Sequence, residues 1–221
     1  MKKAKIGLIV PPKDGGVPPE AQAIYGAQVD FVSYGLGIQQ MAEADFAAAL
    51  EDLESAVHTL LDQDVDAISV MGTSLTFFKG RRGNENIVRL LQQSAPGIPV
   101  STMSSAIIGS LERVGARKVA LFSAYDQDMN QRLISFLEEH GIVVTHTTNL
   151  GLLDIADVHN FSQRALTDLV DGAITEARVD SDALLISCGG LRTLEIRDRH
   201  DDFPIISSAV DGIEDVVSLV G

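Results

Sequence analysis

Two short turns hold the side chains of this chain that are best suited to chemistry. They are Met71-Gly72-Thr73-Ser74-Leu75 and Ser187-Cys188-Gly189-Gly190. Each follows an apolar run that begins with an Asp-Ala pair, and when the runs are aligned the only cysteine, Cys188, falls opposite Gly72. If the turns face each other across a cleft, one wall holds a thiol and the other holds no acid or base. Such a site can deliver a proton to one face of a carbanion but is poorly equipped to exchange protons between faces.

The first turn is a candidate anion site. Thr73 and Ser74 follow a predicted strand at the start of a predicted helix, where free backbone N–H groups and the helix dipole attract a carboxylate without any cation. The alternative interpretation is that Thr73 or Ser74 caps the helix, and the two roles are compatible.

The second turn and one tyrosine are candidates for the opposite wall. Gly189 and Gly190 let the backbone approach a ligand closely and leave N–H groups free for an oxyanion. The alternative for Cys188 is an inert buried cysteine. Tyr125 ends another predicted strand, so its phenol either donates a hydrogen bond to an anion or fills an interface.

The match between the two turns extends to other segments. Lys5–Pro12 is similar to Lys118–Tyr125, and Ile98–Val100 is similar to Phe203–Ile205. Three matched segments in the same order predict a structural repeat. The competing explanation is that α/β segments share a period and nothing more.

The expected architecture is α/β, with two pseudo-symmetric Rossmann-like halves, each a short parallel sheet flanked by helices. Residues 1–110 plus 208–221 are expected to form the first half, and residues 111–207 the second. Because parallel sheets bind ligands at the carboxyl ends of their strands, we expect the active site in the cleft between the halves. The predicted strands are Lys5–Val10, Val29–Val32, Ala67–Met71, Val100–Thr102, Val119–Phe122, Val143–His146, Ala183–Ser187 and Ile205–Ser207. The predicted helices include Asp45–Gln63, Asn130–His140, Phe161–Ala177 and Ala209–Val220.

Composition limits the class of protein. Apolar residues make up 45% of the chain, which is enough to bury a core and too much for a disordered protein. The net charge of −14 argues against a nucleic-acid partner, and means that an anion site must be built locally from N–H groups and hydroxyls. One cysteine permits no internal disulfide and suits a reducing cytoplasm. The apolar run near the N-terminus stops at Pro11, too short for a signal peptide or a membrane span. We therefore expect a cytoplasmic monomer.

Other motifs carry less information. Lys79-Gly80-Arg81-Arg82-Gly83 is interpreted as a solvated surface loop, with a lid over an anion site as the alternative. The five histidines lack metal-ligand spacing, and Gly35-Leu36-Gly37 lacks the spacing of a dinucleotide fingerprint. The sequence therefore predicts no metal and no cofactor.

Together, several segments resemble a known family, the bacterial arylmalonate decarboxylases within the aspartate/glutamate racemase superfamily. The resemblance covers nearly the whole chain. Racemases and maleate isomerases of that superfamily carry a cysteine at both turns, whereas this chain has Gly72 at one and Cys188 at the other, which is the decarboxylase arrangement. The segments that carry the resemblance are Val10-Pro11-Pro12, Gly35-Leu36-Gly37, Met71-Gly72-Thr73-Ser74-Leu75, Ala124-Tyr125 and Ser187-Cys188-Gly189-Gly190-Leu191.

The resemblance implies a cofactor-free, enantioselective decarboxylation of α-aryl or α-alkenyl malonates to monocarboxylic acids. One carboxylate would bind in a dioxyanion hole formed by Thr73, Ser74, Tyr125 and backbone N–H groups around Ser74 and Gly189. The other carboxylate would lie among apolar side chains and leave as carbon dioxide. Cys188, as a neutral thiol, would then protonate one face of the enediolate.

The resemblance also implies an apolar pocket, and here the chain departs from the family pattern. Met41 and Ile155 are bulkier than the expected residues, Val158 is smaller, and Phe46 replaces a tyrosine. The chemistry is therefore better predicted than the substrate range. The implied lining is Pro11, Ile38, Met41, Phe46, Leu75, Ile155 and Val158.

Two other functions compete with this one. The first is a racemase or isomerase of the same superfamily that uses one cysteine, with Tyr125 or a bound water as the second proton carrier. The second is a carboxylate-binding protein without turnover. Replacement of Cys188 separates the binding protein from the two enzymes, because only an enzyme that uses the thiol loses product formation while it retains binding. Gly72→Cys separates the two enzymes, because it should increase racemisation by a decarboxylase, whereas a parent that already racemises well supports the racemase.

Overall fold

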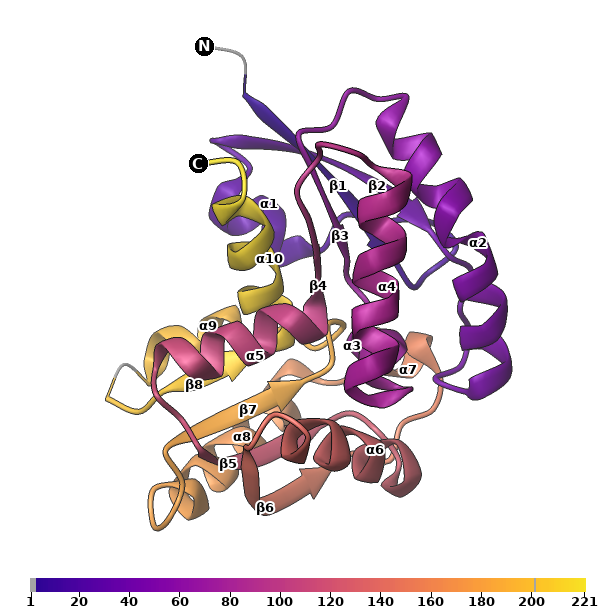
Figure 1. Ribbon diagram of the computed structural model, residues 1–221. Coiled ribbons are helices and arrows are strands. Elements are labelled where there is room, and N and C mark those ends of the chain that lie inside the picture. The colour runs from indigo at the N-terminus through magenta and orange to yellow at the C-terminus, as the bar shows by residue number, and fades with distance from the viewer. Residues whose placement is uncertain (1–2, 201) are drawn as a thin grey trace.

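Two parallel β-sheets form the frame of the protein (Figure 1). The structure, a computed structural model, describes residues 3–200 and 202–221. The strands are β1 (Ala4–Val10), β2 (Val29–Gly35), β3 (Ala67–Val70), β4 (Val100–Thr102), β5 (Lys118–Ser123), β6 (Val143–Asn149), β7 (Ala183–Ser187) and β8 (Ile205–Ser207). Their order is β2-β1-β3-β4 in the first sheet and β6-β5-β7-β8 in the second, with every neighbouring pair parallel. The predicted α/β fold with two similar sheets is therefore confirmed.

The repeat extends to individual hydrogen bonds. In the first sheet the Asp66 carboxylate accepts from the Lys5 N–H at 2.8 Å, and the Asp66 N–H donates to the Lys5 carbonyl at 2.7 Å. In the second sheet Asp182 and Lys118 make the same two bonds at 2.8 and 2.7 Å. A shared period alone would not reproduce this pairing, so the matched segments are a structural repeat.

The two edge strands β2 and β6 are longer than predicted. Each continues for three residues past its predicted end, and the last pairs with the central strands are Val10 with Gly35 and Ser123 with Asn149. The added residues are mostly polar and partly exposed, because an edge strand has a neighbour on one side only. They therefore lacked the apolar pattern on which the prediction depended.

The predicted helices are present with shifted ends, and their caps explain two of the shifts. The helix predicted from Asn130 begins at Gln127, because the Asp126 carboxylate accepts from the Met129 N–H at 2.8 Å. The helix predicted from Phe161 begins two residues later, after the Ser162 cap. The helices are α1 (Pro19–Tyr25), α2 (Glu43–Leu61), α3 (Thr73–Phe77), α4 (Gly80–Ser94), α5 (Met103–Arg113), α6 (Gln127–Glu138), α7 (Ile155–His159), α8 (Gln163–Ala177), α9 (Leu194–Arg199) and α10 (Ser208–Ser218).

The prediction of a surface loop or lid at Lys79–Gly83 is wrong. Gly80 begins helix α4, and the carboxylate of Glu139, the C-cap residue of α6, accepts from the Arg81 N–H at 2.6 Å. Ile87 and Leu91 bury the inner face of this helix. The polar first turns of α4 hid this periodicity from the sequence reading.

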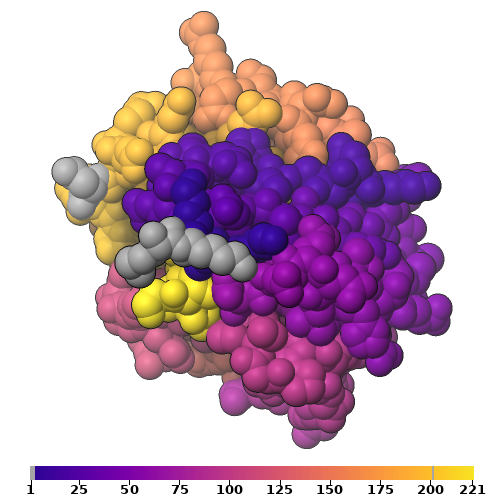
Figure 2. Space-filling model, turned by 90° about the horizontal axis from the view of Figure 1, so that it is seen from above, coloured from indigo at the N-terminus to yellow at the C-terminus, as the bar shows by residue number. Residues whose placement is uncertain are grey.

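Helix α10 connects the end of the chain to the first sheet. It packs against α1, α5, β3 and β4 as well as β7 and β8, and Figure 2 shows the yellow C-terminal segment beside indigo and pink segments. Helix α5 continues through residue 110, and the division of the chain at 110/111 stays a prediction. In the described ranges, no helix combines the length and apolarity needed to cross a bilayer.

Candidate active site

A cavity of about 260 Å³ lies where the strands of both sheets end. Its walls come from the segments that follow β1, β2 and β3 in the first sheet and β5, β6 and β7 in the second. Every side chain predicted for the site lines this one cavity, which places the cleft between the halves as expected. These residues are Pro11, Ile38, Met41, Phe46, Thr73, Ser74, Leu75, Tyr125, Ile155, Val158, Cys188 and Gly189.

The first turn forms a buried floor of hydrogen-bond donors. Thr73 is 2% exposed and Ser74 is 8% exposed at the start of α3. The Thr73 hydroxyl donates to the Met103 sulfur at 2.7 Å, whereas the Ser74 hydroxyl has no partner among the described residues. The first N–H groups of a helix have no acceptor within it, so these amides are available to an anion.

The capping alternative for Thr73 and Ser74 is wrong. Gly72 occupies the N-cap position, and no side chain caps α3. The Thr76 hydroxyl instead donates back to the Gly72 carbonyl at 3.0 Å. Because Gly72 has no side chain to act as a cap, the hydroxyls of the next two residues are not committed to the helix.

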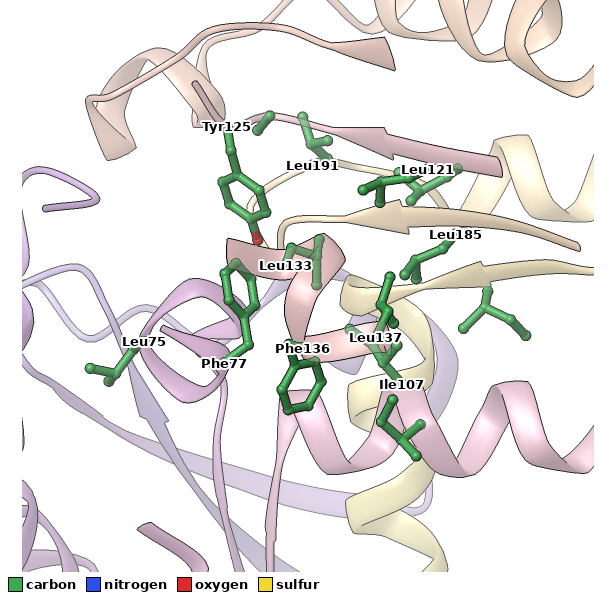
Figure 3. Packing of buried hydrophobic residues seen from close by; sticks show 14 of the residues in the cluster. Leu75, Phe77, Ile107, Leu121, Tyr125, Leu133, Phe136, Leu137, Leu185 and Leu191 are labelled. Atoms are coloured by element: carbon green, nitrogen blue, oxygen red, sulfur yellow. The ribbon is translucent and has the colours of Figure 1, made fainter. Parts of the chain in front are cut away.

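Tyr125 brings a phenol from the second sheet to the first turn. Its ring is fully buried and packs edge-on against Phe77 of α3, with the centroids 5.5 Å apart, and Figure 3 shows the two rings together beside Phe136. The Tyr125 hydroxyl lies 3.2 Å from the Ser187 hydroxyl. Burial and the neighbouring Cys188 raise the pKa of this phenol well above its usual range. Tyr125 is therefore a permanent neutral donor.

Cys188 follows β7 and is partly open to the cavity. Burial raises the pKa of its thiol to about 11, against the opposing effect of the Gly190 N–H, Tyr125 and the Leu191 N–H. The thiol is thus neutral at neutral pH, as a proton donor requires and unlike a nucleophilic cysteine. Its backbone φ of 155° is one that residues with a side chain rarely adopt, and strain of this kind is typical of functional positions.

The second turn differs from the first in one respect. The chain enters α3 directly after Gly72, but after Cys188 it stays irregular until α9 begins at Leu194. The second turn therefore does not lead straight into a helix. The two glycines that follow Cys188 instead allow neighbouring segments to pack closely against this turn.

Gly190 brings helix α7 down onto this turn. A Cβ atom at Gly190 would lie 2.9 Å from the Val158 Cγ1 and 2.8 Å from the His159 Cδ2, closer than side chains tolerate. A second connection lies beside the cavity, where the N–H of Met41, a lining residue, donates to the Leu153 carbonyl at 2.9 Å. The apolar wall is therefore built jointly by both halves.

Four polar residues that the sequence analysis did not select also line the cavity. Asp14, His159 and Arg192 are exposed side chains, whereas Glu20 is only 5% exposed. We call these four the mouth residues. They lie in loops or short helices that carry no recognisable sequence motif. The one signal in the sequence was that the segments containing Asp14 and Arg192 follow the strands β1 and β7. Burial raises the pKa of Glu20 and lowers that of His159.

This arrangement can bind a carboxylate with neutral donors and offer a proton from a neutral thiol beside it. The donors come from the first turn and Tyr125, and the thiol comes from the facing turn. Within the described residues, no group of three or more His, Cys, Asp or Glu side chains is placed to hold a metal ion.

Comparisons with known proteins agree with the resemblance found in the sequence. A family model described as arylmalonate decarboxylase matches residues 6–221. The arylmalonate decarboxylase of Bordetella bronchiseptica is 36% identical over 219 residues, which cover 98% of this chain and 90% of that protein. A double variant of arylmalonate decarboxylase, solved in its liganded form, superposes with a TM-score of 0.92 at 34% identity, covering 99% of this chain and 93% of that one. A maleate isomerase from Pseudomonas putida S16 superposes with a TM-score of 0.86 at 19% identity, covering 99% and 93% of the two chains, a likeness in fold alone.

The raised pKa of Cys188 predicts a slow and steeply pH-dependent reaction with a neutral alkylating agent. With a pKa of about 11, the rate of alkylation by iodoacetamide should rise about tenfold per pH unit from pH 7 to 10 without levelling off. The protein unfolded in urea is the control, since the same single cysteine should then level off near its ordinary pKa of about 8.5. A plateau at that pH in the folded protein would contradict a buried neutral thiol.

Proposed function

Because the chain belongs to the arylmalonate decarboxylase family, we propose that it removes one carboxylate from α-aryl or α-alkenyl malonates without a metal or cofactor. The observation that carries the proposal is the cavity in which Thr73, Ser74 and Tyr125 face Cys188 and no second acid or base stands at Gly72. The single cysteine further supports a cytoplasmic location. We also propose that the enzyme acts as a monomer, without nucleic-acid or membrane partners.

The floor donors are proposed to stabilise the transition state of carbon–carbon cleavage. When carbon dioxide leaves, the bonding electron pair stays on the α-carbon and spreads onto the retained carboxylate, whose oxygens become more negative. Donors at Ser74 and Tyr125, together with the Thr73 hydroxyl once its one O–H turns from the Met103 sulfur to the ligand, therefore bind the enediolate more strongly than the substrate, which is the condition for catalysis. Because these groups are neutral and buried, the field they exert is little screened by water.

The apolar wall is proposed to hold the departing carboxylate. Side chains such as Leu75, Phe46 and Met41 offer that carboxylate no hydrogen bond, whereas the neutral carbon dioxide it becomes needs none. The retained carboxylate, in contrast, has donors on the floor. This difference supports the choice of one of two chemically equivalent carboxylates.

Cys188 is proposed to complete the reaction. The S–H proton is transferred to the α-carbon of the enediolate, which becomes the monocarboxylate, and the resulting thiolate recovers a proton from water. A thiol with a pKa of about 11 carries its proton at neutral pH. With one thiol on one wall, protonation occurs on one face and the product is enriched in one enantiomer.

The test of this function is incubation of the protein with phenylmalonate and methylphenylmalonate, with and without a chelator. With and without the chelator, we expect release of carbon dioxide from both substrates and one preferred enantiomer of the product of methylphenylmalonate, since the product of phenylmalonate is achiral. Cys188→Ala should lower the rate by about two orders of magnitude or more, as expected for loss of a general acid, and should erase the product's handedness. Calorimetric binding of phenylacetate should survive in the variant. No turnover by the parent protein, or turnover only after a metal is restored, would refute the proposal.

Ser74→Ala tests the dioxyanion hole. Loss of one well-placed donor is expected to reduce kcat by about a hundredfold, while KM changes little because the donor acts mainly in the transition state. Ser69→Ala on β3 is the matched control, since the Ser69 hydroxyl is buried, lacks a partner among the described residues and does not line the cavity. The control should retain full activity. An equal effect of both variants would point to a loss of packing instead.

Gly72→Cys separates the decarboxylase from a one-cysteine racemase. A second thiol opposite Cys188 should increase the rate at which one enantiomer of an α-arylpropionate is racemised, measured by chiral chromatography. The new Cβ would lie 3.3 Å from the Pro11 Cγ and the Leu75 Cβ, so both must yield by a few tenths of an ångström. A parent that already racemises this acid as fast as the variant would favour the racemase.

A further inference from the structure

The mouth residues have no part in the proposed chemistry, although all four line the same cavity. The floor donors are almost fully buried, whereas Asp14, His159 and Arg192 are exposed, so the cavity runs from a neutral floor to a charged opening. A substrate whose retained carboxylate is held on the floor can extend its longest arm, the α-substituent, toward the mouth.

Arg192 is the cation of this opening. It is the only lysine or arginine among the residues that line the cavity, and its guanidinium has no hydrogen-bond or ion-pair partner within the described residues. Two later arginines are different: Arg197 binds Glu214 at 2.6 Å, and Arg199 binds Asp171 at 3.1 Å. A guanidinium presents five N–H donors, so those of Arg192 are free to bind a ligand.

The other mouth residues decide which kind of ligand group fits. Asp14 and Glu20 contribute two carboxyl groups beside one guanidinium, and the lowered pKa of His159 keeps that ring neutral at neutral pH. A carboxylate on the ligand would be repelled by Asp14 as well as attracted by the guanidinium, so it gains little from this opening. A hydroxyl accepts from the guanidinium and donates to a carboxylate, without adding charge.

The short sequence separation between Arg192 and Cys188 limits how far the guanidinium lies from the reacting carbon. Arg192 is four residues from Cys188, so their Cα atoms are at most about 14 Å apart, and the irregular turn between them makes the separation shorter. The guanidinium is therefore within reach of the far edge of an aromatic ring whose α-carbon lies at the thiol.

We propose that the mouth residues select α-aryl malonates whose ring carries a hydroxyl group, with Arg192 as the residue that recognises it. This inference rests on the proposed function, since it assumes that the malonate carboxylate occupies the floor. It goes beyond that function because it assigns a substrate class to residues outside the reacting centre. The opening is exposed, so the selection is modest rather than absolute.

Calorimetry with product analogues tests the assignment, because it avoids the electronic effect of the hydroxyl on carbanion formation. Para-hydroxyphenylacetate should bind about tenfold more tightly than phenylacetate, the magnitude expected for a hydrogen bond to a charged group. Arg192→Leu should bring this ratio close to one, and the ratio is the readout because loss of a cation in the cavity also weakens the binding of phenylacetate itself. Arg164→Leu is the matched control, since Arg164 lies exposed on α8 and outside the cavity, and it should preserve the ratio.

A second comparison tests the charge argument. Para-carboxyphenylacetate should bind more weakly than the hydroxyl compound, and Asp14→Asn should strengthen its binding several-fold. Tighter binding of the carboxyl compound by the parent, or an unchanged ratio in Arg192→Leu, would overturn the proposal. Turnover of phenylmalonate is measured in parallel. A parent that keeps the binding ratio but has no turnover would refute the proposed function and leave the recognition by Arg192 standing.

Discussion

Burial of neutral donors next to a neutral thiol is the constraint on which the rest of the site depends. Tyr125 is fully buried, Thr73 nearly so, and burial is also what raises the pKa of Cys188 to about 11. In water, hydroxyls would be weak partners for a growing negative charge, and the thiol would exchange its proton readily. Removed from water, the same groups keep their protons and act on the enediolate with little screening. An acidic chain of net charge −14 can in this way bind an anion without a cation at the reacting centre.

The two-sheet frame explains how such a pocket is assembled. Parallel strands direct their carboxyl ends to one edge, and the repeat brings two such edges together, so that β3 and β7 each supply one wall. Small residues then set the distances within the pocket. Gly72 leaves one wall without an acid or base, and Gly190 allows α7 to close over the other. The two walls of the pocket come from a structural repeat, but one carries Gly72 where the other carries Cys188. The pocket therefore has a thiol on one wall only.

The mouth residues are proposed to have a different role from the donors on the floor. In the proposed mechanism, groups on the floor act on the part of the substrate that changes during the reaction, and they are neutral and buried. Groups at the opening are proposed to contact only the part that stays the same, and two of them, Asp14 and Arg192, are charged and exposed. Catalysis and substrate choice are therefore separated in space, so substitutions at Arg192 or Asp14 can alter the range of substrates without disturbing Cys188.

The sequence by itself determined the α/β class, the repeat and the residues of the two turns, because these depend on local periodicity and on residue type at a fixed spacing. The sequence was also enough to name the residues that the resemblance places at the site, because a matched motif fixes the position of each residue in the chain. All of them line the cavity. Tertiary structure alone decided that α4 is a helix, that Gly72 and not a hydroxyl caps α3, and that Glu20, His159 and Arg192 meet at the opening. Those outcomes depend on contacts between segments distant in the chain, such as Glu139 with Arg81, and no local pattern records such contacts.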